Sequence, residues 1–206
     1  MSRTESGADG VVAWAAVGRA LAGEVSGDAW AVVSSPDRAL VCVVDGLGHG
    51  PQAAEASRLA VATVRAHPSE DLGSLVGRCH VALARTRGVA MALASFSAEG
   101  TVTWLGVGSV DAVLLRAAPG GRRRRETLLV RGGVVGYELP ELHPSTLPVD
   151  RGDTLVMTTD GVRAGFEQGL GGDLRPSDLA RGVVERFATG TDDALVVVVR
   201  YLGGTP

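Results

Sequence analysis

Residues 41–50 read VCVVDGLGHG, and this stretch decides the fold because a continuous apolar run ends in a single carboxylate, Asp45. An unbroken apolar run between turn signals predicts a strand buried on both faces. A carboxylate is costly to bury unless it is paired or binds a cation. Glycines at 46, 48 and 50 allow a tight turn and a close approach of the backbone to a ligand. An ordinary Asp-Gly turn is the alternative, and the positions of other acids decide between the two.

Further acids occupy similar positions at the ends of apolar runs. The stretch TLVMTTDG, residues 154–161, carries Asp160 directly after a β-branched and apolar run. Asp192 and Asp193 directly precede another such run, as does Asp28. Acids at strand ends that are far apart in the sequence can converge at one end of a folded sheet. All-oxygen sites of this type suit magnesium or manganese, and the chain lacks the Cys/His spacing that zinc prefers.

These acid-bearing segments resemble, in order and approximate spacing, the metal-dependent serine/threonine phosphatases of the PPM or type-2C class. The segments are SGD at 26–28, DGLGHG at 45–50, TTDG at 158–161 and TDDALVVVVR at 191–200. The similarity is greatest to the short bacterial SpoIIE/RsbX branch. Two further stretches are similar to its RsbX-like members: GRCHVALARTRGVAMAL at 77–93 and WLGVGSVDAVLLR at 104–116. The resemblance covers about residues 24–200.

The resemblance implies an α+β fold, the PPM-type αββα sandwich of two antiparallel sheets flanked by helices, built as a single domain over residues 1–206. The order of elements agrees, because two adjacent helices among many strands favour a layered sandwich over a doubly wound sheet. Helices are predicted at about 51–66, 70–86 and 176–188. Strands are predicted at about 11–19, 29–34, 39–45, 89–97, 101–107, 110–117, 127–131, 153–159 and 194–201.

The resemblance also implies a site for two Mn²⁺ or Mg²⁺ ions. Asp45 is expected to bridge them, with Asp28 and the Gly46 carbonyl completing one ion's ligands and Asp160 and Asp192 the other's. Asp193 then has a supporting role. A water activated between the ions would attack the phosphoryl group in line, without a covalent phosphoenzyme.

The general acid is left open. Eukaryotic members of the class carry a histidine two residues after the bridging aspartate, where this chain has Leu47. His49 is a nearby candidate, for which a solvated loop histidine is the alternative. A metal-bound water is a further candidate for protonating the leaving serine oxygen.

The implied function is a phosphoserine/phosphothreonine protein phosphatase that acts on phosphorylated STAS-domain antagonists or stressosome proteins in a partner-switching stress-response pathway. One alternative is a catalytically degenerate scaffold of the same pathway. The presence of all the expected acids argues against a scaffold. Clustered carboxylates repel one another and destabilise the metal-free fold, and a protein that only binds a partner does not need them. A third interpretation is a phosphatase that acts on small molecules, although the sequence contains no recognisable sugar- or purine-binding motif.

Composition agrees with one enzyme domain. The 206 residues are 45% apolar, enough for one sizeable core, and the net charge of −3 argues against nucleic-acid binding. No apolar stretch is long enough to span a bilayer, and no signal or sensor segment precedes residue 24, which predicts a freestanding, monomeric, cytoplasmic enzyme. Cys42 and Cys79 are expected to be unpaired core thiols.

Three other features are interpreted as structural. Residues 122–125, RRRR, are expected to form a solvated hairpin loop, with a patch that docks a partner as the alternative. GVGS at 106–109 is expected to form a turn between strands. Histidines without partners at metal-ligand spacing are expected on the surface or on helix faces: His67, His80 and His143.

Overall fold

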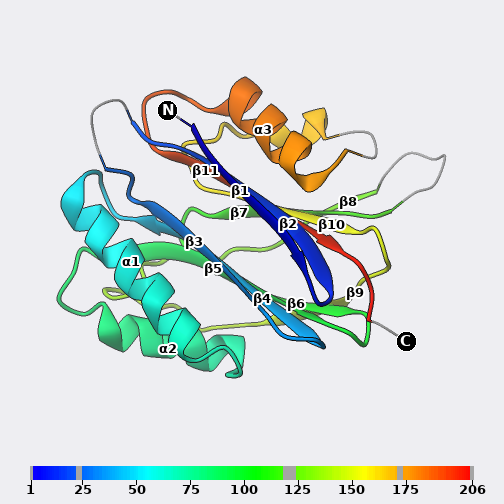
Figure 1. The fold of residues 1–206 in the computed structure, drawn as a ribbon. Helices are drawn as coiled ribbons and strands as arrows, with labels where there is room; N and C mark the ends of the chain where they lie inside the picture. The colour runs from blue at the N-terminus through cyan, green and yellow to red at the C-terminus, as the bar shows by residue number, and fades with distance from the viewer. Residues whose placement is uncertain (1, 22–24, 118–123, 171–173, 205–206) are drawn as a thin grey trace.

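The computed structural model describes residues 2–21, 25–117, 124–170 and 174–204, and within them two antiparallel sheets face each other between outer helices (Figure 1). One sheet has the strand order β1-β2-β11-β10-β7-β8 and the other β3-β4-β5-β6-β9. The strands of the first are β1 (Ser2–Asp9), β2 (Val12–Arg19), β11 (Ala194–Tyr201), β10 (Thr154–Thr158), β7 (Asp111–Leu115) and β8 (Arg125–Thr127). Those of the second are β3 (Asp28–Ser34), β4 (Arg38–Gly46), β5 (Val89–Ser97), β6 (Thr101–Val107) and β9 (Ser145–Pro148). The expected αββα sandwich is confirmed.

The helices cover the outer faces of both sheets. Helices α1 (Pro51–Ala66) and α2 (Leu72–Ala82) pack on the five-stranded sheet, and α3 (Pro176–Phe187) packs on the six-stranded sheet. A short 3-10 helix, η1 (Phe166–Gly169), joins the α3 side. No helix in the described ranges is both long enough and apolar enough to cross a membrane.

Strand β4 is apolar throughout because both of its faces are buried. Val41 and Val43 face the core between the sheets, whereas Leu40, Cys42 and Val44 face the core under α1 and α2. Successive strand residues point to opposite faces, so a strand that is buried on both faces needs apolar residues at every position. Asp45 follows directly, which places its carboxylate at the end of a rigid, fully packed strand.

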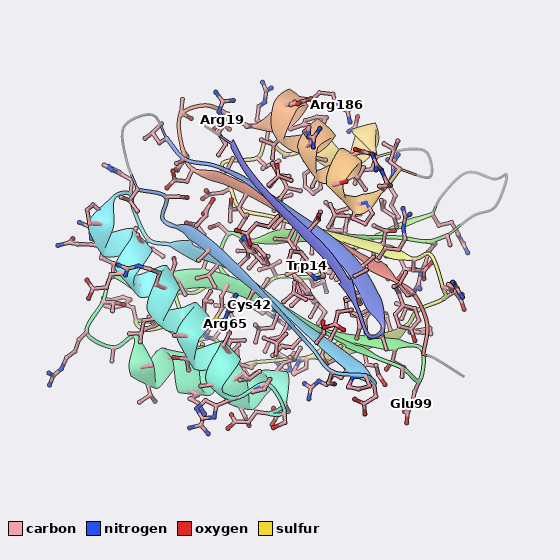
Figure 2. The ribbon with its side chains drawn as sticks, viewed as in Figure 1. Trp14, Arg19, Cys42, Arg65, Glu99 and Arg186 are labelled. Carbon is pink, nitrogen blue, oxygen red and sulfur yellow. The ribbon has the colours of Figure 1, made fainter. Side chains whose placement is uncertain are left out.

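The expected burial of both cysteine thiols is confirmed. Cys42 and Cys79 are free thiols and are both fully buried in the core under α1 and α2. Figure 2 labels Cys42 beside α1. Trp104 is buried, while Trp14 and Trp30 are half-buried with their ring centroids 4.9 Å apart. Burial raises the pKa of both thiols, which keeps them protonated and unreactive.

The first two helices begin where local residues favour it. Pro51 is the first residue of α1, where its missing N–H costs nothing. Asp71 caps α2 by accepting a hydrogen bond from the Ser74 N–H at 2.9 Å. This cap explains why the helix predicted over 70–86 begins at Leu72, and the chain leaves the helix after Ala82.

The sequence pattern missed two strands, β1 and β9, and misplaced a third. Strand β1 carries polar and small residues at the edge of its sheet, yet all eight of its residues pair with β2. Strand β9 spans only four residues and pairs with β6. The strand predicted over 127–131 is β8, Arg125–Thr127, which forms the expected hairpin with β7. Of the predicted arginine loop, Arg122 and Arg123 lie outside the described residues.

Truncating a side chain between the sheets should be costly. Leu155, on β10, is fully buried in that core, so Leu155→Ala is expected to lower the free energy of unfolding by about 2–5 kcal/mol. Leu129→Ala is the matched control, because Leu129 is 87% exposed and its loss should change stability by less than about 0.5 kcal/mol. Urea denaturation of both variants measures the difference, and equal losses would contradict this placement of the core.

Candidate active site

Asp28 and Asp45 lie directly opposite each other on neighbouring strands. Asp28 begins β3, Asp45 is the second-last residue of β4, and the antiparallel register pairs the two. Both side chains are half-buried. The two carboxylates therefore reach the same end of the five-stranded sheet.

Asp160 and Asp192 come to that end from the six-stranded sheet. Asp160 follows β10 by two residues, and Asp192 precedes β11 by two. Strands β10 and β11 pair antiparallel with Thr158 opposite Val196, so the end of one strand meets the start of the other. Both carboxylates are exposed. The four acids predicted from the sequence thus come from two different sheets to one end of the sandwich.

Thr159 connects the two sheets at this end. Its hydroxyl donates to Asp28 Oδ2 at 2.9 Å and accepts a hydrogen bond from the Leu195 N–H, also at 2.9 Å. Thr159 is itself buried. One side chain therefore fixes a carboxylate of the five-stranded sheet relative to the six-stranded sheet. Thr159 was not predicted as a site residue, since a threonine next to Asp160 has no distinguishing pattern.

Asp193, for which the resemblance implies a supporting role, bonds to the backbone of a neighbouring segment. Its carboxylate is 4% exposed and accepts hydrogen bonds from the Leu21 N–H at 2.7 Å and the Gly27 N–H at 2.6 Å. Both donors belong to the connection between β2 and β3. Asp193 therefore positions the segment that leads into Asp28, and both of its carboxylate oxygens already accept backbone hydrogen bonds.

The glycines after Asp45 and Asp160 are required by close packing. A Cβ at Gly46 would lie 2.3 Å from the Ala53 carbonyl oxygen, and one at Gly161 would lie 1.8 Å from the Asp193 carbonyl oxygen. Neither glycine has a positive φ, unlike Gly48 at 82°. The two Asp-Gly pairs therefore mark places where a neighbouring backbone passes against the strand end.

Burial and like charges make Asp28 and Asp45 hard to ionise. Burial, Asp160 and Asp192 raise the pKa of Asp45 to about 7. Burial and Asp45 raise the pKa of Asp28 well above its ordinary value, against the opposing hydrogen bond from Thr159. A cation among these acids would relieve the repulsion that raises both pKa values.

Two polar residues at the site were not predicted. Ser109, in the turn between β6 and β7, donates a hydrogen bond of 3.4 Å to Asp45 Oδ2, so the GVGS turn contributes a site contact. Arg87 lies opposite Gly48 beyond the β4–β5 ladder, and a Cβ at Gly48 would meet its guanidinium at 2.6 Å. The sequence alone does not indicate either contact. Both depend on the register of the paired strands.

His49 lies in the exposed loop between β4 and α1, four residues after Asp45. The Leu47 N–H of this loop bonds to the Gly88 carbonyl at 3.1 Å, which fixes the loop against the start of β5. The other three histidines lie away from the acids. His80 accepts a hydrogen bond from the Gly136 N–H, and His67 and His143 lie beside glutamates.

A family model described as Stage II sporulation protein E (SpoIIE) matches residues 35–202. The chain belongs to the SpoIIE family. The match includes Asp45, Asp160 and Asp192 and begins after Asp28, which the structure nevertheless pairs with Asp45.

Similar proteins agree with this membership. Phosphoserine phosphatase RsbX of Bacillus subtilis (strain 168) is 28% identical over 140 residues, which are 67% of this chain and 68% of RsbX. A solved structure from work on the bacterial stressosome is also 28% identical, with a TM-score of 0.82 over 96% of this chain and all of that one. RsbX in complex with magnesium has a TM-score of 0.85 at 20% identity, over 97% of this chain and all of that one, and shows the shared fold. The chain is therefore an enzyme of the phosphatase class to which SpoIIE and RsbX belong.

The acidic side chains of this SpoIIE-family site are of a chemical type that binds divalent cations. In the ranges that the structure describes, no three Asp, Glu, His or Cys side chains lie close enough together to enclose one ion as they stand. The charges of Asp160 and Asp192 nevertheless act on Asp45, and those of Asp45 and Asp160 act on Asp28. All four donors are carboxylates, the ligands that hard cations such as magnesium and manganese prefer.

A methyl group at Gly161 should disturb the site through the backbone. Gly161→Ala would force Cβ against the Asp193 carbonyl and is expected to cost about 2 kcal/mol or more of unfolding free energy. Gly77→Ala is the matched control, because nothing lies within 4 Å of a Cβ at this α2 position and alanine favours a helix by about 1 kcal/mol. Chemical denaturation distinguishes the two, and a neutral Gly161→Ala would contradict the close approach.

The raised pKa of Asp45 predicts how the metal-free protein responds to pH. The folded state holds the Asp45 proton more tightly than the unfolded chain, whose aspartate pKa is about 3.9. Stability should therefore fall as pH rises from about 4 to about 7, because the folded protein binds more protons over this interval. In the presence of a chelator, Asp45→Asn should raise the melting temperature at pH 8 and have a smaller effect at pH 5.

Asp150→Asn is the control for this pH experiment, since Asp150 is exposed and precedes the opposite end of β10. Thermal melts of both variants at the two pH values give the comparison. A larger gain for Asp45→Asn at pH 5 than at pH 8 would show that repulsion at Asp45 is not the cause.

Proposed function

We propose that this SpoIIE-family chain is a magnesium- or manganese-dependent phosphatase of phosphoserine and phosphothreonine in a regulatory protein. The observation that carries the proposal is the convergence of Asp28 and Asp45 from one sheet with Asp160 and Asp192 from the other. Family membership and the likeness to RsbX support the reaction class. Both sheets supply acids, which supports residues 1–206 acting as one catalytic domain, and one copy of the chain supplies all four.

We assign Asp45 as the ligand shared by two cations, because its carboxylate is influenced by acids of both sheets. Asp28 and the Gly46 carbonyl would hold one ion, and Asp160 and Asp192 the other. Bound cations of this kind activate a water and neutralise the phosphoryl oxygens. The two-ion count follows from the resemblance to the PPM class.

The protein's own residues keep the carboxylates in position. Thr159 orients Asp28, Ser109 donates to Asp45, and Asp193 holds the backbone that leads into Asp28. These contacts leave the remaining carboxylate oxygens available for cations. His49 stays a candidate for protonating the leaving serine oxygen, since it lies in the exposed loop that follows Asp45.

The proposed substrate is a serine- or threonine-phosphorylated STAS-domain protein of a partner-switching or stressosome pathway. The support is the similarity to RsbX, named as a phosphoserine phosphatase, and to a chain from the stressosome work.

The test is phosphate release from a serine-phosphorylated STAS-domain protein with Mn²⁺, with Mg²⁺ and with a chelator. Asp45→Asn is expected to slow release by about 10³-fold or more, since each 1.4 kcal/mol of lost transition-state stabilisation costs a factor of about ten and a metal supplies several kcal/mol. Asp150→Asn should retain wild-type release.

Each other outcome identifies a specific failure. Release that persists in the chelator or in Asp45→Asn would overturn the metal-site assignment. Tight binding of the phosphoprotein without release by the wild type would favour the scaffold alternative. Turnover of p-nitrophenyl phosphate with none of the phosphoprotein would move the substrate to another molecule.

A further inference from the structure

A cleft of about 570 Å³ continues from the candidate active site along the first helix. Residues of helix α1 line one wall, residues of strands β1 and β2 line the other, and the start of β3 lies between them. Ser26 and Asp28 line the end of the cleft that it shares with the acid site. The remaining lining is mostly small or apolar: Ala16, Gly18, Ala20, Ala29, Trp30, Val61, Ala62 and Leu195.

The wall from α1 is a single stripe of the helix. Arg58, Val61, Ala62 and Arg65 all line the cleft, and their spacing of three, four and seven residues places them on one helical face. The stripe begins next to the site, because the preceding residue, Ser57, donates a hydrogen bond to the Gly27 carbonyl. The cleft therefore leads away from Asp28 along two turns of α1.

Two arginines mark this wall. Both Arg58 and Arg65 are exposed, and neither forms an ion pair with a residue that the structure describes. Arg58 donates through Nε to the Ala54 carbonyl of its own helix, while Arg65 lies two turns further on (Figure 2). Glu5 lies on the opposite wall. A bound segment would therefore meet positive charge on the α1 side and a carboxylate on the β1 side.

We propose that this cleft binds the segment of the protein substrate that flanks its phosphorylated residue, with acidic side chains of that segment contacting Arg58 and Arg65. The proposal rests on the proposed phosphatase function and adds the chemistry of the recognised sequence. Continuity with Asp28 argues for the substrate as the occupant, because a segment lying in the cleft enters the acid site at its end. The two guanidinium groups have no ion pair among the described residues, which argues for acidic side chains.

The geometry sets the spacing of the acids. Seven residues of an α-helix rise about 10.5 Å, which separates the two arginines along the cleft. An extended chain places side chains of the same side about 7 Å apart at two residues and about 13 Å apart at four. Since arginine side chains are long and flexible, acids two or four residues apart both fit. Strand β3 is an edge strand and pairs with β4 alone among the described strands, so its outer backbone edge can support an extended segment.

The main test reverses both charges and compares a phosphoprotein with p-nitrophenyl phosphate. In Arg58→Glu/Arg65→Glu, kcat/KM for a phosphoprotein with acidic flanking residues should fall at least about tenfold more than kcat/KM for p-nitrophenyl phosphate, because like charges then oppose docking. Arg151→Glu/Arg181→Glu is the matched control, with the same charge change at two exposed arginines outside the cleft. It should preserve both values. An equal loss on both substrates would overturn the docking role.

A second variant tests the cleft by shape. Ala62 is exposed on the α1 wall, so Ala62→Trp fills the cleft without entering the core. It should raise KM for the phosphoprotein more than it lowers kcat for p-nitrophenyl phosphate. An unchanged KM for the phosphoprotein would show that the substrate lies elsewhere.

Direct binding separates this inference from the proposed function. A fluorescent, unphosphorylated peptide with acids two and four residues apart should bind the wild type, and binding should weaken in Arg58→Glu/Arg65→Glu and at high salt. A peptide with alanine in place of the acids is the control. Equal binding of the two peptides overturns the inference, whereas acid-dependent binding together with a lack of phosphate release leaves the cleft in place and overturns the phosphatase reaction.

Discussion

The mutual repulsion of four carboxylates at one end of the sandwich is the constraint on which the structure of the site depends. Asp28, Asp45, Asp160 and Asp192 would move apart if their strands were loosely held. The resistance comes from contacts just behind them. Both carboxylate oxygens of Asp193 accept hydrogen bonds from the backbone N–H groups of Leu21 and Gly27. Thr159 bonds to Asp28 and to β11. The acids therefore stay together because neighbouring polar groups hold their strands.

The fold was predictable where its strands carry a strong apolar pattern. Strand β4 is buried on both faces and appears in the sequence as an unbroken apolar run, and β10 and β11 are similar. Strand β1 was not predictable, because an edge strand with polar and small residues has little apolar signal. Its eight residues are ordered by pairing with β2, which is a tertiary effect.

The acids of the candidate site were predictable because each stands at the end of such a run. The hydroxyl groups were not. Ser109 reaches Asp45 from a turn 64 residues away, and Thr159 meets Asp28 across the gap between the sheets. Serine and threonine are common, so only the packed structure distinguishes these two. Gly46 was expected in a tight turn, but the structure shows that Gly46 and Gly161 admit the backbones of Ala53 and Asp193.

The division of the acids between two sheets has a mechanical consequence. Asp28 and Asp45 move with one sheet, and Asp160 and Asp192 move with the other. The layer between the sheets is apolar and mixes small and branched side chains with the aromatic rings of Phe96 and Trp104. Such a layer resists compression, and directional bonds that oppose sliding lie at its two ends. Thr159 bonds to Asp28 at the site, and the Tyr201 hydroxyl donates to the Ser97 carbonyl at the far end of β11. A shift of one sheet along the other would separate the two halves of the site while every strand and helix stayed intact. At the site the alignment of the two sheets therefore depends on Thr159, while Tyr201 anchors the opposite end of β11.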